Sequence, residues 1–174
     1  MRIAVFAKAP VAGRVKTRLA PLLGDEGAAT LHMHLVHRAL ATAVDSGVGA
    51  VELWCAPDAY HPFFRECASR YGVRLQAQAG DDLGARMNHA FETSHSEGQP
   101  LVLIGCDCPM LEGSTLRDAA AALASDDAAF APAEDGGYVL VGLAKPAPRL
   151  FEAIEWGTPS VMDYTRARLR SAGL

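Results

Sequence analysis

Short runs of branched and aromatic residues alternate along the chain with longer segments whose apolar residues recur every three or four positions. The short runs predict strands, and the longer segments predict amphipathic helices. The expected strands span 2–7, 51–55, 73–77, 101–104, 128–132 and 138–143. The expected helices span 25–46, 60–71, 114–124 and 160–170, and a further helix opens within 80–86 and runs to about 96. This alternation predicts an α/β fold, with a mostly parallel central sheet and helices on both faces.

The segment Leu101–Leu111 carries the first candidate site. Leu101–Ile104 is a continuous branched-apolar run, which is typical of a strand buried on both faces of a parallel sheet. Ligands of open α/β sheets bind beyond the carboxyl ends of the strands, so Asp107 is placed where a metal ion or a phosphate would be met. The alternative is that Asp107 caps the next helix, a role for which Ser114 and Thr115 are better placed.

The long loop after the first strand, from Lys8 to Gly24, carries the second candidate site. Loops of more than about 12 residues in compact domains are usually functional or disordered. This loop holds the cations Lys8, Arg14, Lys16 and Arg18, and Gly13 frees backbone amides beside them. Such a set suits a pyrophosphate. The alternative is a solvated turn, in which the clustered positive charges would repel one another without an anion to neutralise them. Val15 precedes Lys16 where a Walker P-loop requires glycine, so that class of ATPase is disfavoured.

Asp135, in the segment Glu134–Gly137 between the last two strands, is the second candidate carboxylate. If those strands lie beside Leu101–Ile104, Asp107 and Asp135 can approach each other and hold Mg²⁺ (or Mn²⁺) together with phosphate oxygens. Gly136 and Gly137 would then let a substrate approach the backbone, with Tyr138 following them. The alternative, weighed equally on this pattern, is an ordinary Asp-Gly turn between two strands.

The histidines and cysteines are predicted to be structural. His32, His34 and His37 share no single helix face, so they are expected to be solvated or to lie at the boundary of the core. The four cysteines lack the paired spacing of a zinc site and the composition of a disulfide-rich secreted domain. We therefore expect reduced thiols, including Cys106 and Cys108, that behave as small hydrophobic residues.

Length and composition indicate what kind of protein this is. The 174 residues fit one domain spanning 1–174, which can bury about two-thirds of its unfolded surface. A net charge of −4 argues against a nucleic-acid partner. No apolar run approaches the ~20 residues of a membrane span, and Arg2 already belongs to the first strand, so we expect a cytoplasmic protein without a signal peptide. The oligomeric state stays open.

Several segments together resemble one bacterial family. They are Phe6–Pro21, Gly80-Asp-Asp-Leu-Gly-Ala-Arg-Met87, Ile104-Gly-Cys-Asp-Cys-Pro109, Pro132-Ala-Glu-Asp-Gly-Gly-Tyr138 and Trp156-Gly-Thr158. In this order they are similar to the DUF2064 family, which is placed in the nucleotide-diphospho-sugar transferase (GT-A) superfamily. The resemblance covers nearly the whole chain and implies a single-domain Rossmann-like GT-A fold.

The resemblance also implies roles for residues. Gly13, Arg14, Lys16 and Arg18 match the loop that holds nucleotide phosphates, and Asp82, Gly84 and Arg86 match a segment near the nucleotide. Asp107 matches the metal-binding aspartate. This sequence departs from relatives at Cys106, where Ser or Thr is common, and at Asp107-Cys108-Pro109, where many glycosyltransferases have Asp-x-Asp. Asp135 is therefore the candidate second metal ligand, and Trp156 and Thr158 receive no role.

The implied activity is a Mg²⁺-dependent transfer from a nucleotide-diphosphate sugar to a small-molecule acceptor, with Asp135 as a candidate base. The first alternative is a nucleotidyltransferase that joins a nucleoside triphosphate to a phosphorylated metabolite and releases pyrophosphate. The strongly basic loop favours that alternative, whereas the family's labels favour glycosyl transfer. The second alternative is a nucleotide-binding module without turnover.

Overall fold

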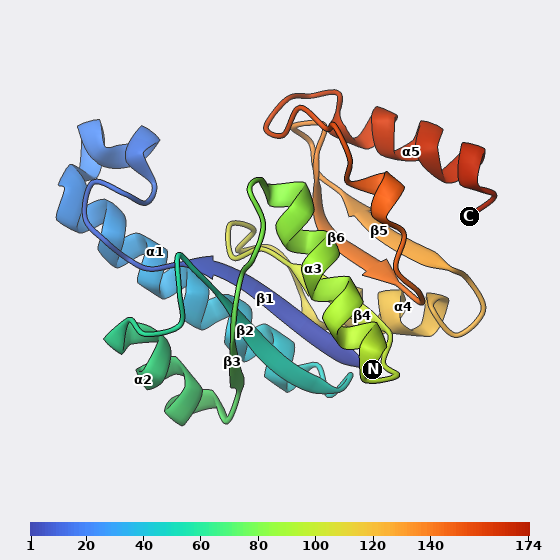
Figure 1. Ribbon diagram of the computed structural model, residues 1–174. Helices are drawn as coiled ribbons and strands as arrows, with labels where there is room; N and C mark the ends of the chain where they lie inside the picture. The colour runs from blue at the N-terminus through green and yellow to red at the C-terminus, as the bar shows by residue number, and fades with distance from the viewer.

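The computed structural model describes residues 1–174 and contains one six-stranded sheet in the order β3-β2-β1-β4-β6-β5 (Figure 1). The strands are β1 Arg2–Lys8, β2 Ala50–Ala56, β3 Arg74–Ala77, β4 Leu101–Ile104, β5 Ala128–Pro132 and β6 Tyr138–Leu143. The neighbours β3, β2, β1 and β4 pair in parallel, while β6 is antiparallel to both β4 and β5. The predicted α/β fold with a mostly parallel sheet is confirmed, and one reversed strand interrupts it.

Helices cover both faces of the sheet. They are α1 Ala20–Asp45, α2 Pro62–Tyr71, α3 Leu83–Ser96, α4 Gly113–Ala122 and α5 Val161–Ala172. Successive side chains of a strand point to opposite faces, so Ile3 and Val5 of β1 pack with α1, α2 and α4, whereas Ala4 and Phe6 pack with α3. Figure 1 shows α3 in front of the sheet, with α1 and α4 behind it. None of the helices combines the length and the apolar character that a membrane span requires.

Two local expectations about helix starts are wrong. α1 begins at Ala20, after a short 3₁₀ turn Thr17–Leu19, rather than at Asp25. Gly24, at φ 70° and ψ 165°, interrupts it, so the predicted start at Asp25 coincides with a kink. Helix α4 has Glu112 at its N-cap position without a side-chain cap, so the hydroxyl-bearing residues that follow do not cap it.

The strand register brings three connections to one edge of the sheet. Val5 of β1 pairs with Ile104 of β4, so both parallel strands end at the same edge. Ile104 also pairs with Leu140 of the antiparallel β6, which places the start of β6 and the preceding turn at that edge. The basic loop, Asp107 and the Asp135 turn therefore leave the sheet together, which meets the condition set for Asp135 from the sequence.

Gly136 is required by close backbone packing. Its φ is 86°, and a Cβ atom there would overlap the Pro159 carbonyl. The Gly136 carbonyl also accepts a hydrogen bond of 2.8 Å from the Met162 amide. The missing side chain thus makes room for the segment that precedes α5. This structural role is separate from the substrate approach that the sequence predicts for Gly136.

We predict that Gly136→Ala destabilises the protein by about 2 to 6 kcal/mol, because a left-handed alanine and an overpacked contact each cost about 1 to 3 kcal/mol. Gly98→Ala is the matched control, since Gly98 has φ 72° but nothing within 4 Å of the added carbon. It should lose only about 1 to 2 kcal/mol. Urea unfolding measures both, and equal losses would show that the Pro159 contact is unimportant.

Candidate active site

The predicted basic loop lines a cavity of about 640 Å³ at the carboxyl edge of the sheet. Its wall includes the cations Lys8, Arg14, Lys16 and Arg18, together with His32 and Asp107. Gly13 lies in the same loop at φ 73° but does not line the cavity. The structure therefore gathers the four cations of the basic loop around one space beside Asp107.

Lys16 and Asp107 form an ion pair across this cavity. Lys16 Nζ lies 2.8 Å from Asp107 Oδ1, and the Lys16 backbone reaches this position in the left-handed conformation, at φ 50°. Burial would raise the pKa of the Asp107 carboxyl, but the hydrogen bond and charge of Lys16 outweigh it and hold that pKa below its usual range. The lowered pKa keeps the carboxylate ionised, and the side chain, which is 71% exposed, is open to a ligand.

His32 lies inside the protein, and its prediction as a solvated or boundary residue is wrong. It is 4% exposed because it shares the buried face of α1 with Ala28, Val36 and Leu40, at successive four-residue steps. His32 Nε2 lies 2.9 Å from the Lys8 carbonyl, which can only accept, so Nε2 carries the proton. Burial lowers the pKa of His32, so the ring is neutral and Nδ1 keeps its lone pair. His34 is exposed, as predicted.

Cys106 is a buried, reduced thiol beside Asp107. All four cysteines are free, as predicted. Cys106 Sγ donates a hydrogen bond of 3.3 Å to Asp107 Oδ1, and burial raises the pKa of the thiol to about 12. A thiol in this state is a poor nucleophile. Cys106 therefore does more than fill the core, because it also contacts the carboxylate.

A second, largely apolar cavity of about 350 Å³ adjoins the basic one. Phe6, Leu83, Gly105 and Asp107 line both cavities. The apolar cavity is also lined by Asp135, Gly137, Tyr138, Trp156, Thr158 and several aliphatic side chains. Asp107 thus lies where a strongly cationic space meets an apolar one, and Trp156 and Thr158, which the sequence left without a role, belong to the apolar side.

Two buried polar atoms belong to residues of the apolar cavity. Tyr138 Oη and Trp156 Nε1 have no hydrogen-bond partner, and their rings meet edge to face with centroids 6.3 Å apart. Burial also raises the pKa of the Tyr138 phenol, so the group stays protonated. Each group is a hydrogen-bond donor that the protein leaves without an acceptor.

Asp135 occupies an exposed turn at the rim of the apolar cavity. Its Oδ1 accepts a hydrogen bond of 3.0 Å from the Gly137 amide, which is the local turn considered as the alternative for this sequence. Asp135 also lines the cavity with Asp107. A local turn and a position in the candidate site are therefore compatible for this residue. The one cluster of three metal-ligating side chains consists of His32, Cys106 and Asp107, without Asp135.

The segment that contains Asp82, Gly84 and Arg86 has local structural roles. The Asp82 carboxylate caps α3 by accepting from the Ala85 amide at 2.7 Å, and Arg86 Nε donates to the Gly80 carbonyl at 3.0 Å. Gly84 is buried, and a Cβ there would overlap the Phe151 carbonyl. None of the three lines either cavity.

The residue of this segment that reaches the site is Leu83, which lines both cavities. Sequence reasoning missed it, since a lone leucine beside two carboxylates gives no signal of its own. Asp82 gives an indirect signal, because its cap fixes the first turn of α3 and thereby places Leu83, the next residue.

Comparison with known proteins places this chain in a family. The family described as "Uncharacterized protein conserved in bacteria (DUF2064)" matches residues 39–158. This chain belongs to the DUF2064 family. The family resemblance inferred from the sequence segments is thereby confirmed. No curated protein sequence matches the chain.

Solved structures relate this DUF2064 protein to transferases. A crystal structure of a candidate nucleotide-diphospho-sugar transferase from Desulfovibrio desulfuricans G20 shares 34% identity, with a TM-score of 0.89 over 99% of this chain and 76% of that one. A cytidylyltransferase from Leptospira borgpetersenii is similar at 14% identity and a TM-score of 0.63, over 97% of this chain and 71% of that one. A nucleotidyl transferase from Methanothermobacter thermautotroptrophicus is similar at 18% identity and a TM-score of 0.57, over 99% of this chain and 83% of that one.

The two more distant likenesses show a shared fold alone. Together with the candidate transferase, they establish that this DUF2064 protein has a nucleotide-sugar transferase-like fold. The predicted fold superfamily is confirmed.

Proposed function

We propose that the protein is a divalent-metal-dependent transferase that takes a nucleotide-diphosphate sugar and moves the sugar to a small-molecule acceptor. The observation that carries the proposal is the position of Asp107, where the basic cavity meets the apolar one. A diphosphate suits the first space and a sugar with its acceptor suits the second. The bond to be broken would then lie beside Asp107.

The basic cavity offers the phosphates two kinds of support. Arg14, Lys16 and Arg18 supply cationic donors, which bind phosphate oxygens more strongly than neutral donors do. The Lys16 ammonium already lies beside a carboxylate oxygen, so it can pass to a phosphate when a ligand enters. In this proposal the cations bind the diphosphate and share the charge that develops as it leaves.

A metal ion fits the exposed side of Asp107. Mg²⁺ and Mn²⁺ prefer oxygen ligands, and the 71% exposed carboxylate supplies them, with Asp135 as the candidate second ligand. When bound, such an ion neutralises charge on the phosphate oxygens. The role of the chain is to hold the ion at Asp107 and to place the diphosphate against it through the basic loop.

The apolar cavity suits a sugar and its acceptor. Aromatic and aliphatic walls with a few polar groups are typical of small-molecule sites, and Tyr138 and Trp156 combine both features here. Asp135 at the rim is proposed to accept the proton of the acceptor hydroxyl. Gly137 lies beside it in the wall, where the lack of a side chain leaves room for that hydroxyl.

We predict that Tyr138→Phe leaves stability unchanged or slightly higher, because the buried hydroxyl that it removes has no partner in the protein. The same variant should bind a nucleotide sugar about 3- to 10-fold more weakly than the parent protein does, the scale of one neutral hydrogen bond. Affinity for the nucleoside diphosphate should not change. Calorimetry with both ligands measures this, and an equal loss for both would remove Tyr138 from the sugar site.

The second candidate function is nucleotidyl transfer to a phosphorylated metabolite. Four cations around one cavity favour it, because a triphosphate carries more charge than a diphosphate and a pyrophosphate must be stabilised as it leaves. The two reactions differ in their products, which are a nucleoside diphosphate in the first and pyrophosphate in the second. Tight metal-dependent binding without either product would select a module that only binds nucleotides.

Thermal unfolding tests the binding part of the proposal. A ligand at a hundred times its dissociation constant adds about 2.7 kcal/mol to the stability of the folded state. We expect nucleotide sugars with Mg²⁺ to raise the melting temperature more than nucleosides or nucleoside triphosphates do. Stabilisation by triphosphates alone would favour the second candidate. A cytoplasmic location and the lack of a nucleic-acid partner stay predictions.

A further inference from the structure

We propose that His32, Cys106 and Asp107 form a binding site for a borderline-soft divalent ion such as Zn²⁺ or Co²⁺. This site shares Asp107 with the oxygen-ligated Mg²⁺ of the proposed function and adds His32 and Cys106, and the inference does not depend on which reaction the protein catalyses. It rests on the positions of the three side chains, on a buried nitrogen without a partner and on the kind of atoms that meet there.

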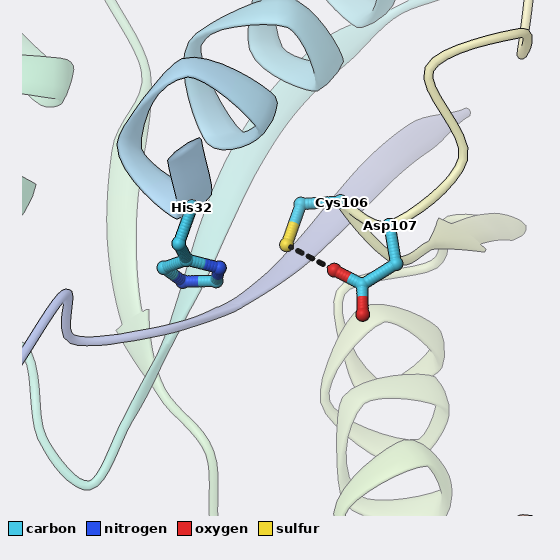
Figure 2. A group of neighbouring side chains, drawn as sticks. All are labelled: His32, Cys106 and Asp107. Atoms are coloured by element: carbon cyan, nitrogen blue, oxygen red, sulfur yellow. Dashed lines mark hydrogen bonds between the residues drawn. The ribbon is translucent and has the colours of Figure 1, made fainter. Parts of the chain in front are cut away.

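The three side chains come from two segments that are far apart in the sequence. His32 lies on α1, whereas Cys106 and Asp107 directly follow β4, and their ligand atoms all lie within 4.8 Å of one another. Figure 2 shows a ring nitrogen of His32 turned toward Cys106, whose sulfur lies against the Asp107 carboxylate. Zinc bonds of about 2.0 to 2.3 Å can bridge such a group after small side-chain movements.

The second observation is the state of His32 Nδ1. The ring is 4% exposed, and its Nε2 proton is used by the Lys8 carbonyl, so Nδ1 is an acceptor. Nδ1 is also buried without any hydrogen-bond partner. A buried acceptor without a partner is costly, and metal ligation would satisfy it. The bond from Nε2 to a backbone carbonyl is the outer contact that commonly orients a ligating histidine.

The donor set selects the kind of ion. A thiolate, an imidazole and a carboxylate suit Zn²⁺ and Co²⁺, whereas Mg²⁺ takes oxygen ligands. Three protein ligands also leave a fourth position open on a tetrahedral ion. Binding would form a sulfur–metal bond at Cys106 and release the thiol proton to solvent.

Binding also has an opposing charge to overcome. The Lys16 ammonium lies 2.8 Å from Asp107 Oδ1, so an ion that takes this oxygen must displace Lys16. The Lys16 side chain is only 17% exposed, so an ion that binds Oδ1 competes with a partly buried ammonium. The other carboxylate oxygen offers a route that leaves the pair intact.

Cobalt absorption tests the site on the full chain without any nucleotide. Addition of Co²⁺ to the reduced protein should give a thiolate-to-cobalt charge-transfer band that saturates at one ion per chain, and Zn²⁺ but not Mg²⁺ should remove it. Cys106→Ser should abolish the band. His32→Gln should weaken cobalt affinity by at least about tenfold, the lower end of the effect of residues that only support a ligand.

The matched controls are Cys108→Ser and His34→Gln, which change the same residue types close by without touching the cluster. Both should keep the band and the affinity, and thermal unfolding should show that every variant is folded. Absence of a band in the folded parent protein overturns the proposal. A band that survives Cys106→Ser, that Cys108→Ser abolishes, or that is indifferent to His32→Gln would also overturn it.

Discussion

An Asp107→Asn protein is expected to fold normally, to lose all Mg²⁺ dependence of nucleotide binding and to lose at least about a hundredfold in turnover. The amide that replaces the carboxylate keeps its shape but lacks the negative charge that an ion requires. Loss of one group that stabilises developing charge typically costs about 10²- to 10³-fold in rate. The fold should survive, because the Asp107 side chain is 71% exposed and the carbonyl oxygen of an asparagine can still accept a hydrogen bond from Lys16.

Calorimetric titration of the nucleoside diphosphate, with and without Mg²⁺, measures the binding part of this prediction. Asp118→Asn is the matched control, since it removes one exposed carboxylate on α4 away from both cavities. The control should bind as the parent protein does. If Asp107→Asn keeps the full effect of Mg²⁺ on affinity, the assignment of the metal to Asp107 is wrong.

The second large effect is expected at Lys16. Lys16→Ala should weaken binding of a nucleoside diphosphate by about 1.5 to 3 kcal/mol, the scale of a charged hydrogen bond, which is about 10- to 150-fold in affinity. Binding of the corresponding nucleoside should change much less, because it carries no phosphate. The reason is the position of Lys16 Nζ, which lies in the basic cavity directly beside Asp107.

Lys145→Ala separates this effect from a general loss of positive charge. Lys145 is exposed and lines neither cavity, so its removal lowers the net charge equally without touching the site. Its affinity for both ligands should equal that of the parent protein. Equal losses for nucleoside and diphosphate in Lys16→Ala would show that this side chain does not meet the phosphates.

The part of the site that the sequence predicts follows from strong local signals. The apolar run Leu101–Ile104 identifies a buried strand, and its end fixes the edge at which Asp107 lies. The cations of the basic loop are conspicuous in an acidic chain, and the structure places them around one cavity. The position of β6 between β4 and β5 could not be predicted, because strand order depends on tertiary packing rather than on any local pattern.

His32 illustrates why the rest was missed. Leu31 and Leu35 of α1 are only half-buried, whereas the stripe through Ala28, His32, Val36 and Leu40 is buried against the sheet. The four-residue spacing of that stripe was a usable signal. The partner of His32, the Lys8 carbonyl, was not predictable because it depends on how α1 crosses β1.

The Gly80–Arg86 segment contains residues that were predicted for the site but make structural contacts instead. Resemblance placed Asp82, Gly84 and Arg86 near the nucleotide, but their contacts in the structure cap and pack the start of α3. A cap three residues before its amide partner is a local pattern that the sequence does contain. These residues support the wall that Leu83 gives to both cavities, so a role in nucleotide binding would act through that wall.

Product analysis tests the central claim most directly. The protein is incubated with Mg²⁺, nucleotide sugars, nucleoside triphosphates, sugar phosphates and candidate acceptors, and pyrophosphate and nucleoside diphosphate are assayed separately, with Asp135→Asn as the control. The account predicts release of nucleoside diphosphate from a nucleotide sugar, dependent on an acceptor and strongly reduced in the control. Pyrophosphate release that depends on a phosphorylated co-substrate, with no diphosphate formed from any nucleotide sugar, would contradict it.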